Sequence, residues 1–200
     1  MFEELRLRNN PGILMGRLPS NLLDLLKQNI KQAAEARVGY NEKLIGQIEE
    51  QYKLQIDLRV SDFVRKMAVD YQQTFNFEVA NSPKIVELWV NLQKKHEYNP
   101  VHNHFAKLGW VIWVQIPYDL NAELNAPNIA NTVGDRKRNS AFEFVYTKYT
   151  GEIQTHPIFL SKEDEGKIIM FPKGLKHTVY PFFTSDGYRI SVAGNIDLIA

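Results

Sequence analysis

The segment HEYNPVHNH, residues 96–104, holds three of the five histidines of this 200-residue chain. His102 and His104 are two positions apart, and such side chains point to the same face of a β-strand. Imidazole is a common ligand of divalent transition metals, so a strand that carries both rings into a pocket could bind one ion. An isolated H-x-H pair is weak evidence, because two surface histidines can share a strand face by chance.

The C-terminal half adds a third candidate ligand and a candidate anion site. In GKIIMFPKGLKHTVYPF, His177 follows a Pro-Lys-Gly turn that could direct its ring inward. Arg189 comes twelve residues later in YRISV, with Ser191 two positions beyond, in a segment typical of a buried strand. A buried guanidinium is costly unless it is paired, and a carboxylate is its best partner. That carboxylate could belong to an internal Asp or Glu, or to a bound ligand.

The composition limits the classes of protein to consider. Apolar residues make up 44% of the chain, which is enough for a packed core, and the net charge of +1 gives no sign of a nucleic-acid surface. The absence of cysteine excludes disulfides and thiolate chemistry and fits a reducing compartment. No stretch approaches a membrane span, and MFEELRLRNN lacks the layout of a secretion signal. We therefore expect a cytoplasmic protein, in the host cytoplasm if the chain is viral.

The elements that must position these residues differ between two parts of the sequence. Residues 1–77 read as mainly helical after a short extended opening, ILMGRLP. The pattern predicts a helix from Ser20 that stops near Gly39, and a shorter helix over NEKLIGQIEEQY. A third helix is expected to begin near Ser61, whose hydroxyl would cap it. Its packing face would contain Val64, Met67, Ala68, Tyr71 and Phe75.

Residues 78–200 read as short β-strands without intervening helices, which favours an antiparallel sandwich, jelly roll or barrel. The polar stretch 121–140 joins two of these strands, and connections of this length are often disordered or act as lids. Arg136, Lys137 and Arg138 within it are expected to form a solvated tip. The predicted strands lie in KIVELWVNLQ, WVIWVQIP, AFEFVYTKY, GKIIMFP, KHTVYPFF and YRISVAGNI.

The order H-x-H, then His, then R-x-S on successive β segments resembles the iron(II)/2-oxoglutarate-dependent oxygenases. More narrowly, LWVNLQKKHEYNPVHNH, WVIWVQIP and GKIIMFPKGLKHTVYPFFTSDGYRISVAGNI are similar to prolyl-hydroxylase-like oxygenases common in marine bacteria and phages. The resemblance spans residues 86–197. Its C-terminal block is the most specific part, because the FP, H-x-V-x-P-F and R-I-S-V elements occur in the order of the family.

This resemblance implies an α+β chain whose catalytic core is a double-stranded β-helix, a cupin-like jelly roll, with the N-terminal helices packed on it in one domain. It implies that His102, His104 and His177 bind iron(II). It also implies that Arg189 and Ser191 hold the distal carboxylate of 2-oxoglutarate. Tyr98 and Asn99 flank the histidine motif in the sequence and could hydrogen-bond the cosubstrate or water. The implied activity uses O2 and couples oxidative decarboxylation of 2-oxoglutarate to hydroxylation of an unidentified substrate, either a peptidyl residue or a small molecule.

The sequence departs from the wider superfamily at one ligand, where H-x-D or H-x-E is usual and His104 stands instead. A neutral imidazole in place of a carboxylate raises the net charge of the site by one. Either His104 is the ligand, which its i+2 position favours, or another carboxylate such as Glu97 or Glu143 completes the set. His96 is an even number of positions from His102 and His104, so in one strand it would point to the same face. Pro100 interrupts the strand between them, so His96 is expected at the rim or surface.

Two other classes of protein remain open at this stage. A metal-dependent cupin that ignores 2-oxoglutarate would explain G-x5-P-x-G-x2-H, from Gly166 to His177, but the glutamate expected soon after H-x-H is missing. A non-enzymatic jelly roll with a vestigial metal site is the other alternative. His156, Trp110 and Trp113 are read as structural residues. The sequence gives no sign of a membrane partner, and its amphipathic helices would permit a homodimer.

Overall fold

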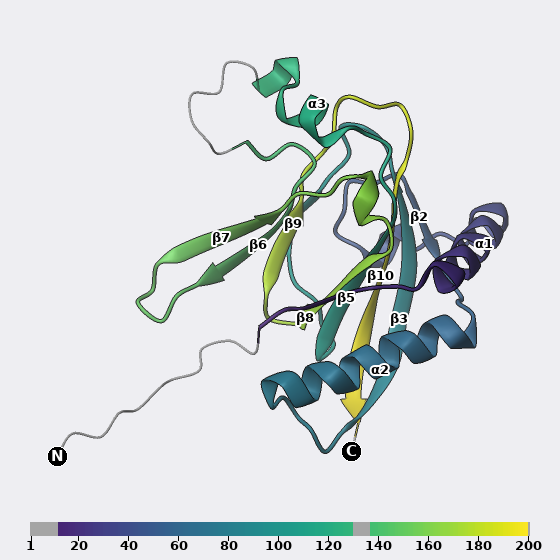
Figure 1. Cartoon of the computed structure of the whole chain (residues 1–200), viewed down its shortest axis with the longest axis vertical. Helices are drawn as coiled ribbons and strands as arrows, with labels where there is room; N and C mark the ends of the chain where they lie inside the picture. The colour runs from purple at the N-terminus through teal and green to yellow at the C-terminus, as the bar shows by residue number, and fades with distance from the viewer. Residues whose placement is uncertain (1–11, 130–136, 200) are drawn as a thin grey trace.

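Two antiparallel β-sheets share one core, and two helices cover the larger sheet (Figure 1). The computed structural model describes residues 12–129 and 137–199. In sheet order, the six-stranded sheet contains β1 (Leu14–Arg17), β8 (Lys167–Pro172), β5 (Leu108–Gln115), β10 (Arg189–Ile199), β3 (Ser82–Gln93) and β2 (Glu50–Lys53). The four-stranded sheet contains β4 (Asn99–His102), β9 (Lys176–Val179), β6 (Phe142–Thr147) and β7 (Ile153–Ile158). Facing antiparallel sheets of this kind define a jelly roll.

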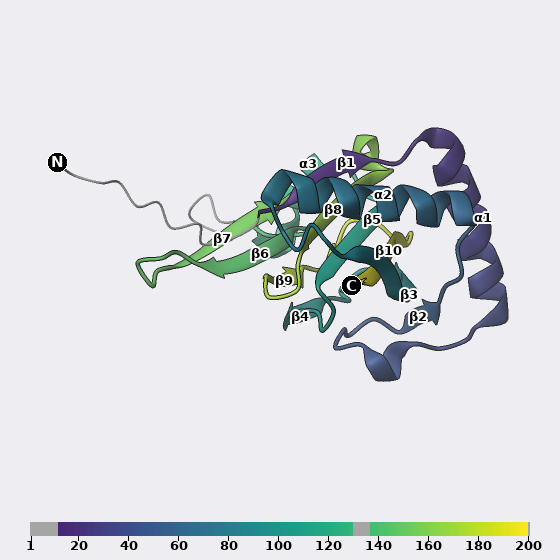
Figure 2. The same cartoon turned by 90° about the horizontal axis from the view of Figure 1, so that it is seen from below.

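Each face of the six-stranded sheet has its own apolar cluster. On the outer face, residues such as Trp110, Ile112 and Val192 pack against the helices. On the inner face, Trp113 and Phe171 meet Phe142 and other aromatic residues of the four-stranded sheet. Figure 2 shows α2 on the opposite side of the large sheet from β4 and β9. Both tryptophans of β5 are buried, as predicted, and β5, which has both faces covered, is apolar from Leu108 to Val114.

Helix α1 (Ser20–Ala36) and helix α2 (Leu58–Phe75) confirm two of the three predicted helices. Helix α1 ends before Gly39, because Arg37 takes the left-handed conformation and its N–H closes the last turn on Ala33. The predicted Ser61 cap is wrong. Asp57 caps α2, since its carboxylate accepts from the N–H of Arg59 at 2.9 Å, whereas the Ser61 hydroxyl donates back to a carbonyl inside the helix.

The predicted helix over residues 41–52 is wrong. The chain makes a single 3-10 turn, Asn41–Lys43, and then enters β2, which pairs with β3. A helix of this length is marginal by itself, while the open edge of β3 offers backbone hydrogen bonds to an extended chain. Gly46 also brings the chain so close to Asn99 that a Cβ would lie 2.0 Å from the Asn99 Oδ1.

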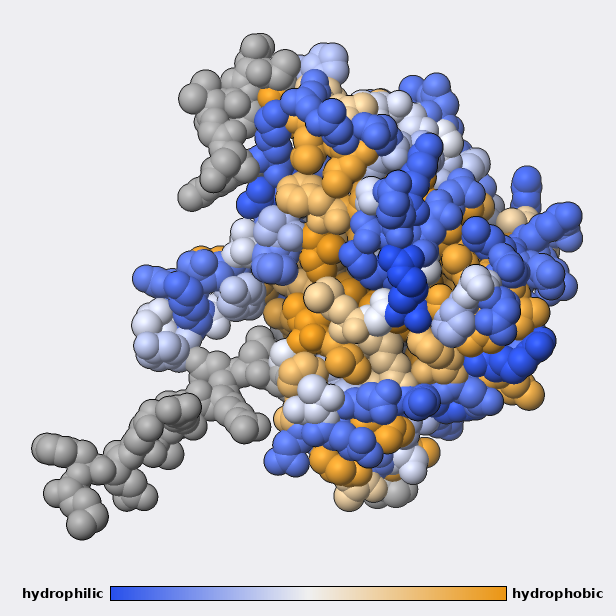
Figure 3. All heavy atoms as spheres, viewed as in Figure 1, coloured by the Kyte–Doolittle hydropathy of each residue, from blue (hydrophilic) through white to orange (hydrophobic). Residues whose placement is uncertain are grey.

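The division of the sequence at residue 77 is not a division of the sheets. The N-terminal part supplies β1 and β2, which are the two edge strands of the six-stranded sheet. The outer surfaces of α1 and α2 are mainly hydrophilic, and hydrophobic side chains gather between them and the β6–β7 hairpin on the face shown in Figure 3. Among the helices that the structure describes, none is long and apolar enough to span a bilayer.

The described ends of the polar stretch 121–140 are both anchored by hydrogen bonds. It begins with helix α3 (Leu120–Leu124) and the 3-10 turn Pro127–Ile129. The buried carboxylate of Glu123 accepts from the backbone N–H groups of Phe183 and Thr184. Lys137 and Arg138 are not a solvated tip, because they bond a carbonyl of α3 and the Glu143 carboxylate. Arg136 lies outside the described residues. A further 3-10 turn, Lys162–Asp164, precedes β8.

Candidate active site

The three predicted histidine ligands meet between the two sheets. His102 ends β4 and stands directly opposite His177 of β9, with ring centroids 4.2 Å apart. His104 lies two residues past the end of β4, so the expectation that one strand carries both histidines is wrong. A hydrogen bond from the His104 N–H to the Lys173 carbonyl, 3.2 Å, ties its turn to the turn before β9. As a result, ligand nitrogens of all three rings lie within 4.8 Å of one another.

The imidazoles are oriented as metal ligands usually are. Nδ1 of His102 is 2.8 Å from the Pro100 carbonyl and Nδ1 of His177 is 3.3 Å from the Leu175 carbonyl, so each Nδ1 carries the proton and each Nε2 is free. The Nε2 atoms of His104 and His177 are 3.3 Å apart. Two nitrogens that share an ion at about 2.1 Å each must lie within roughly 4.2 Å of one another, and this pair does. The His104–His177 pair therefore has the spacing of two ligands of one ion, and three neutral imidazoles are a donor set that suits a transition metal.

Burial keeps these histidines in the neutral form that binds metals. Desolvation lowers the pKa of His102, lowers the pKa of His104 to about 4, and lowers the pKa of His177 well below its usual value. The neighbouring rings lower the pKa of His104 and His177 further, while Asn195 and Glu87 oppose the shift at His104. At neutral pH the metal-free rings carry no charge, so binding a cation requires no deprotonation.

The two carboxylates considered as alternatives to His104 are engaged elsewhere. Glu97 accepts hydrogen bonds from the backbone N–H groups of Lys94 and Glu49, at 2.7 and 3.0 Å. Glu143 pairs with Arg138 and also accepts from the Tyr180 hydroxyl. The group of potential metal ligands found in the described residues consists of the three histidines alone. His104 is therefore the third ligand that the geometry offers.

Arg189 is buried, with 2% of its surface exposed, and its partners are neutral. It donates two hydrogen bonds to Oε1 of Gln93 and one each to the carbonyls of Ser140 and Tyr180. Within the described residues no carboxylate forms an ion pair with it, so the internal Asp or Glu considered from the sequence is not there. A buried cation satisfied only by dipoles retains its full charge and favours an anionic ligand.

One pocket joins the arginine to the histidines. It is lined by His102, His104, His177, Arg189 and Ser191, and by apolar and amide side chains around them. The enclosed space is about 40 Å³, so a five-carbon dicarboxylate requires side chains to move. Gln93 is the obvious one, because it lines the pocket and occupies two donors of the guanidinium.

Ser191 lines this pocket, whereas Tyr98, His96 and His156 are not among its described lining residues. Ser191 accepts a 3.2 Å hydrogen bond from the Asn91 amide. Tyr98 is 36% exposed and is absent from the described lining, where Asn99 appears instead, so its role as a cosubstrate ligand stays a prediction. His96 is exposed and its ring contacts Phe183, and His156 is exposed on β7.

The sequence did not single out the amides that surround Arg189 and Ser191. Gln93 faces Arg189 across the β3–β10 pair, and Asn91 faces Ser191 in the same pair. Gln51 of β2 continues this second row and donates to Asn91 at 2.8 Å. The available signal is the alternation of polar residues in β3 and β10, but it identifies partners only once the register is known.

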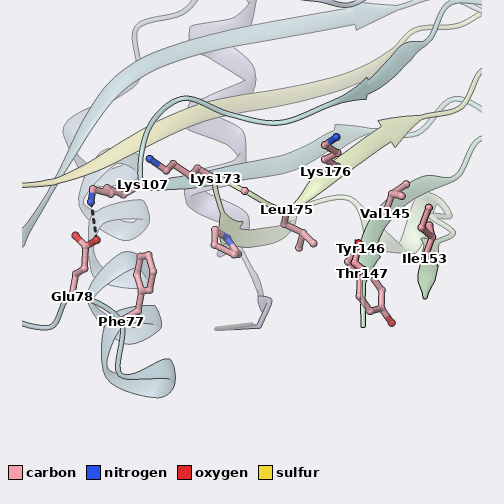
Figure 4. A pocket seen from close by; sticks show the side chains of 12 residues that line it. Phe77, Glu78, Lys107, Val145, Tyr146, Thr147, Ile153, Lys173, Leu175 and Lys176 are labelled. Atoms are coloured by element: carbon pink, nitrogen blue, oxygen red, sulfur yellow. Dashed lines mark hydrogen bonds and ion pairs between the residues drawn. The ribbon is translucent and has the colours of Figure 1, made fainter. Parts of the chain in front are cut away.

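A cleft of about 310 Å³ opens over His102 and His104 to the surface. Its lining includes Trp89 and Asn99, and Phe105 at its edge is 94% exposed. A larger pocket of about 630 Å³ lies between Phe77 and the β6–β7 hairpin and is shown in Figure 4. No histidine lines it, and its Lys107 is paired with Glu78 at 2.8 Å. Lys176 lines both spaces, so they adjoin.

A jelly roll with a three-histidine group inside it and a buried arginine beside that group defines a metal-dependent enzyme of the double-stranded β-helix class. The family described as "putative 2OG-Fe(II) oxygenase" matches residues 87–195. This is more than half of the chain, and the chain belongs to that family. Its activity class is therefore that of an iron(II)- and 2-oxoglutarate-dependent oxygenase. No curated protein sequence gives a significant match.

Solved structures of low sequence identity share the fold. A prolyl-4-hydroxylase from Pseudomonas putida is 13% identical with a TM-score of 0.58, covering 94% of this chain and 93% of that one. The viral collagen prolyl hydroxylase of Paramecium bursaria Chlorella virus-1, in complex with 2-oxoglutarate, is 12% identical with a TM-score of 0.55, covering 94% and 96%. HygX from Streptomyces hygroscopicus, with nickel and 2-oxoglutarate bound, is 10% identical with a TM-score of 0.55, covering 93% and 82%. These matches confirm the double-stranded β-helix.

Proposed function

We propose that His102, His104 and His177 hold the iron(II) of this oxygenase, and that Arg189 and Ser191 bind the distal carboxylate of 2-oxoglutarate. The observation that carries the proposal is the single pocket lined by all five side chains. A cation and an unneutralised guanidinium at two places in one pocket suit a ligand with a chelating group at one end and a carboxylate at the other.

The bound iron and cosubstrate supply the oxidation, in which O2 converts 2-oxoglutarate to succinate and carbon dioxide and hydroxylates a C–H bond of the substrate. The chain itself binds, orients and excludes water. Arg189 can offer two parallel N–H donors to a carboxylate once Gln93 releases them. Trp113 and Phe142, both buried in the inner cluster, form an apolar wall of the pocket and restrict water there.

We favour a peptide segment over a small molecule as the substrate. The cleft above His102 and His104 is open to the surface and adjoins the larger pocket of Figure 4 through Lys176. Ile45 and Val101 line the cleft and are more than half exposed. An extended chain could place one residue at the metal while its flanks contact these side chains. Two proteins of similar fold are prolyl hydroxylases.

The cytoplasmic location, the homodimer and an origin in a phage stay predictions from the sequence. The cupin alternative accounts for the histidines but gives Arg189 no ligand to bind. The anchored residues that flank 130–136 bring the Ser140 carbonyl to Arg189, which supports a role for the polar stretch near the cosubstrate end of the pocket.

Turnover of 2-oxoglutarate tests this proposal. Purified protein supplied with 2-oxoglutarate, iron(II), ascorbate and O2 should form succinate, measured by mass spectrometry. In the absence of the substrate to be hydroxylated, this uncoupled turnover should be slow. His177→Ala should abolish succinate formation. His156→Ala is the matched control, because this histidine is exposed on β7 outside the pocket, and it should turn over normally. Equal succinate formation by both variants would contradict the histidine assignment.

A further inference from the structure

His104 differs from the other two histidines in how its ring is held. Backbone carbonyls two residues upstream fix Nδ1 of His102 and of His177. Among the described residues, no backbone carbonyl is hydrogen-bonded to the imidazole ring of His104, whose Nε2 faces His177. A ligand imidazole normally needs a partner on its other nitrogen, because that partner selects the tautomer and the ring orientation. The third histidine therefore requires a side chain to do what a carbonyl does for the first two.

The ring of His104 packs against a row of four residues that are paired across the large sheet. Glu87, Asn195, Gly109 and Phe171 stand opposite one another in β3, β10, β5 and β8. The imidazole of His104 lies over Gly109, where an added Cβ would be 2.9 Å from its Cδ2 atom. Its ring also meets Phe171 edge-on, with centroids 5.6 Å apart. Glycine at this position provides the space that the ring occupies.

Asn195 is the polar member of the row that adjoins the ring. It is 3% exposed, and its Nδ2 donates to the Glu87 carboxylate, which also accepts from the Tyr40 hydroxyl. Because the amide nitrogen is committed to Glu87, Oδ1 must point the other way. That oxygen is buried and has no hydrogen-bond partner among the described residues. A buried unpaired amide oxygen is costly, and Asn195 and His104 line the same cleft.

We propose that Asn195, held by Glu87, positions His104 as the third metal ligand by accepting the Nδ1–H of its ring. This inference rests on the metal site of the proposed function and adds two positioning residues to it. The arrangement presents Nε2 of His104 beside Nε2 of His177. It also places the negative charge of Glu87 behind a set of three neutral ligands, where the wider superfamily has a carboxylate in the set itself. Glu87, which bonds Asn195 and is not itself a metal ligand, thus supplies the negative charge that His104 lacks.

The tautomer of His104 can be read in the metal-free protein. Two-bond proton–nitrogen NMR of protein labelled at its five histidines should show His104 as the Nδ1–H form. Asn195→Ala should convert it to the Nε2–H form or a mixture. Glu87→Gln keeps an acceptor for the Asn195 amide, so the tautomer should stay as in the wild type. Asn139→Ala removes an equally buried asparagine elsewhere and should leave the His104 signals unchanged.

Metal affinity gives the second readout, independent of turnover. Cobalt(II) titration followed by visible absorption should show 10- to 100-fold weaker binding for Asn195→Ala and a smaller loss for Glu87→Gln, with wild-type affinity for Asn139→Ala. An unchanged tautomer and cobalt affinity in Asn195→Ala would overturn the inference while leaving the metal site intact. A wild-type protein that binds no cobalt would instead overturn the metal site. A wild-type His104 in the Nε2–H form would overturn the positioning role by itself.

Discussion

Replacement of Arg189 by lysine separates binding of the cosubstrate from binding of the metal. Lysine keeps the positive charge but offers a point contact in place of two parallel donors. A hydrogen bond to a charged group contributes about 1.5–3 kcal/mol, so loss of one predicts roughly 10- to 150-fold weaker 2-oxoglutarate binding. Complete removal by Arg189→Ala should weaken binding further, but it also strands Gln93 and the carbonyls of Ser140 and Tyr180. The lysine variant is therefore the cleaner test.

Calorimetry on protein loaded with manganese(II) measures this affinity without turnover. The affinity for manganese itself should stay within about twofold of the wild type, because Arg189 contacts no histidine in the described structure. Arg65→Lys is the matched control, since Arg65 is partly exposed on α2 and its ion pair in the described structure is with Asp62. Wild-type 2-oxoglutarate affinity in Arg189→Lys, or a parallel loss of manganese, would refute the assignment of the arginine.

Three further outcomes follow from the described contacts. Gln93→Ala should tighten 2-oxoglutarate binding severalfold in the same calorimetric titration, because Gln93 occupies two donors of Arg189; weaker binding would show that the amide assists the ligand. Asp57→Ala should remove the cap of α2 and lower Tm by roughly 2–4 °C in a calorimetric scan, whereas an unchanged Tm would exclude a stabilising cap. Metal-free protein should lose stability as pH falls from 6.5 toward 4, because the unfolded chain protonates His104 in that window and the folded chain does not. Urea unfolding at pH 7.5 and 5 should show a loss of about 2 kcal/mol from this residue, and an equal pH slope in His104→Gln would contradict it.

The chemistry of the site could be predicted from the sequence because it depends on residue type and order. His102, His104, His177 and Arg189 were identified before any contact was known, and the structure brings them to one pocket. The strand argument for His104 was nevertheless wrong, since β4 ends at His102. The i+2 spacing succeeded because the turn after β4 is tied to the turn before β9, which is a tertiary constraint that spacing does not reveal.

The supporting residues could not be predicted because their partners are distant in the sequence. Asn195 and Glu87 are 108 residues apart, and Arg189 and Gln93 are 96 apart. A shift of one residue in the pairing of β3 with β10 would place the two side chains of the shifted strand on the opposite face from their partners. That pairing contains a bulge beside Asn195, which local periodicity does not indicate.

The errors in the N-terminal part have the same origin. Apolar spacing alone fits residues 41–52 to a helix about as well as to a strand, and the free edge of β3 decides the outcome. Strongly amphipathic segments such as α1 and α2 were predicted correctly. A helix with one apolar face can bury that face against almost any apolar surface, so its formation does not depend on one particular partner.

An anaerobic titration of the metal-free protein tests the central claim most directly. Iron(II) is added first and 2-oxoglutarate second, while visible absorption is recorded. We expect a metal-to-ligand charge-transfer band that appears only when both are present, that is lost in His177→Ala, and that requires higher 2-oxoglutarate concentrations in Arg189→Lys. Iron binding without this band would contradict the cosubstrate site, and no iron binding at all would contradict the three-histidine centre.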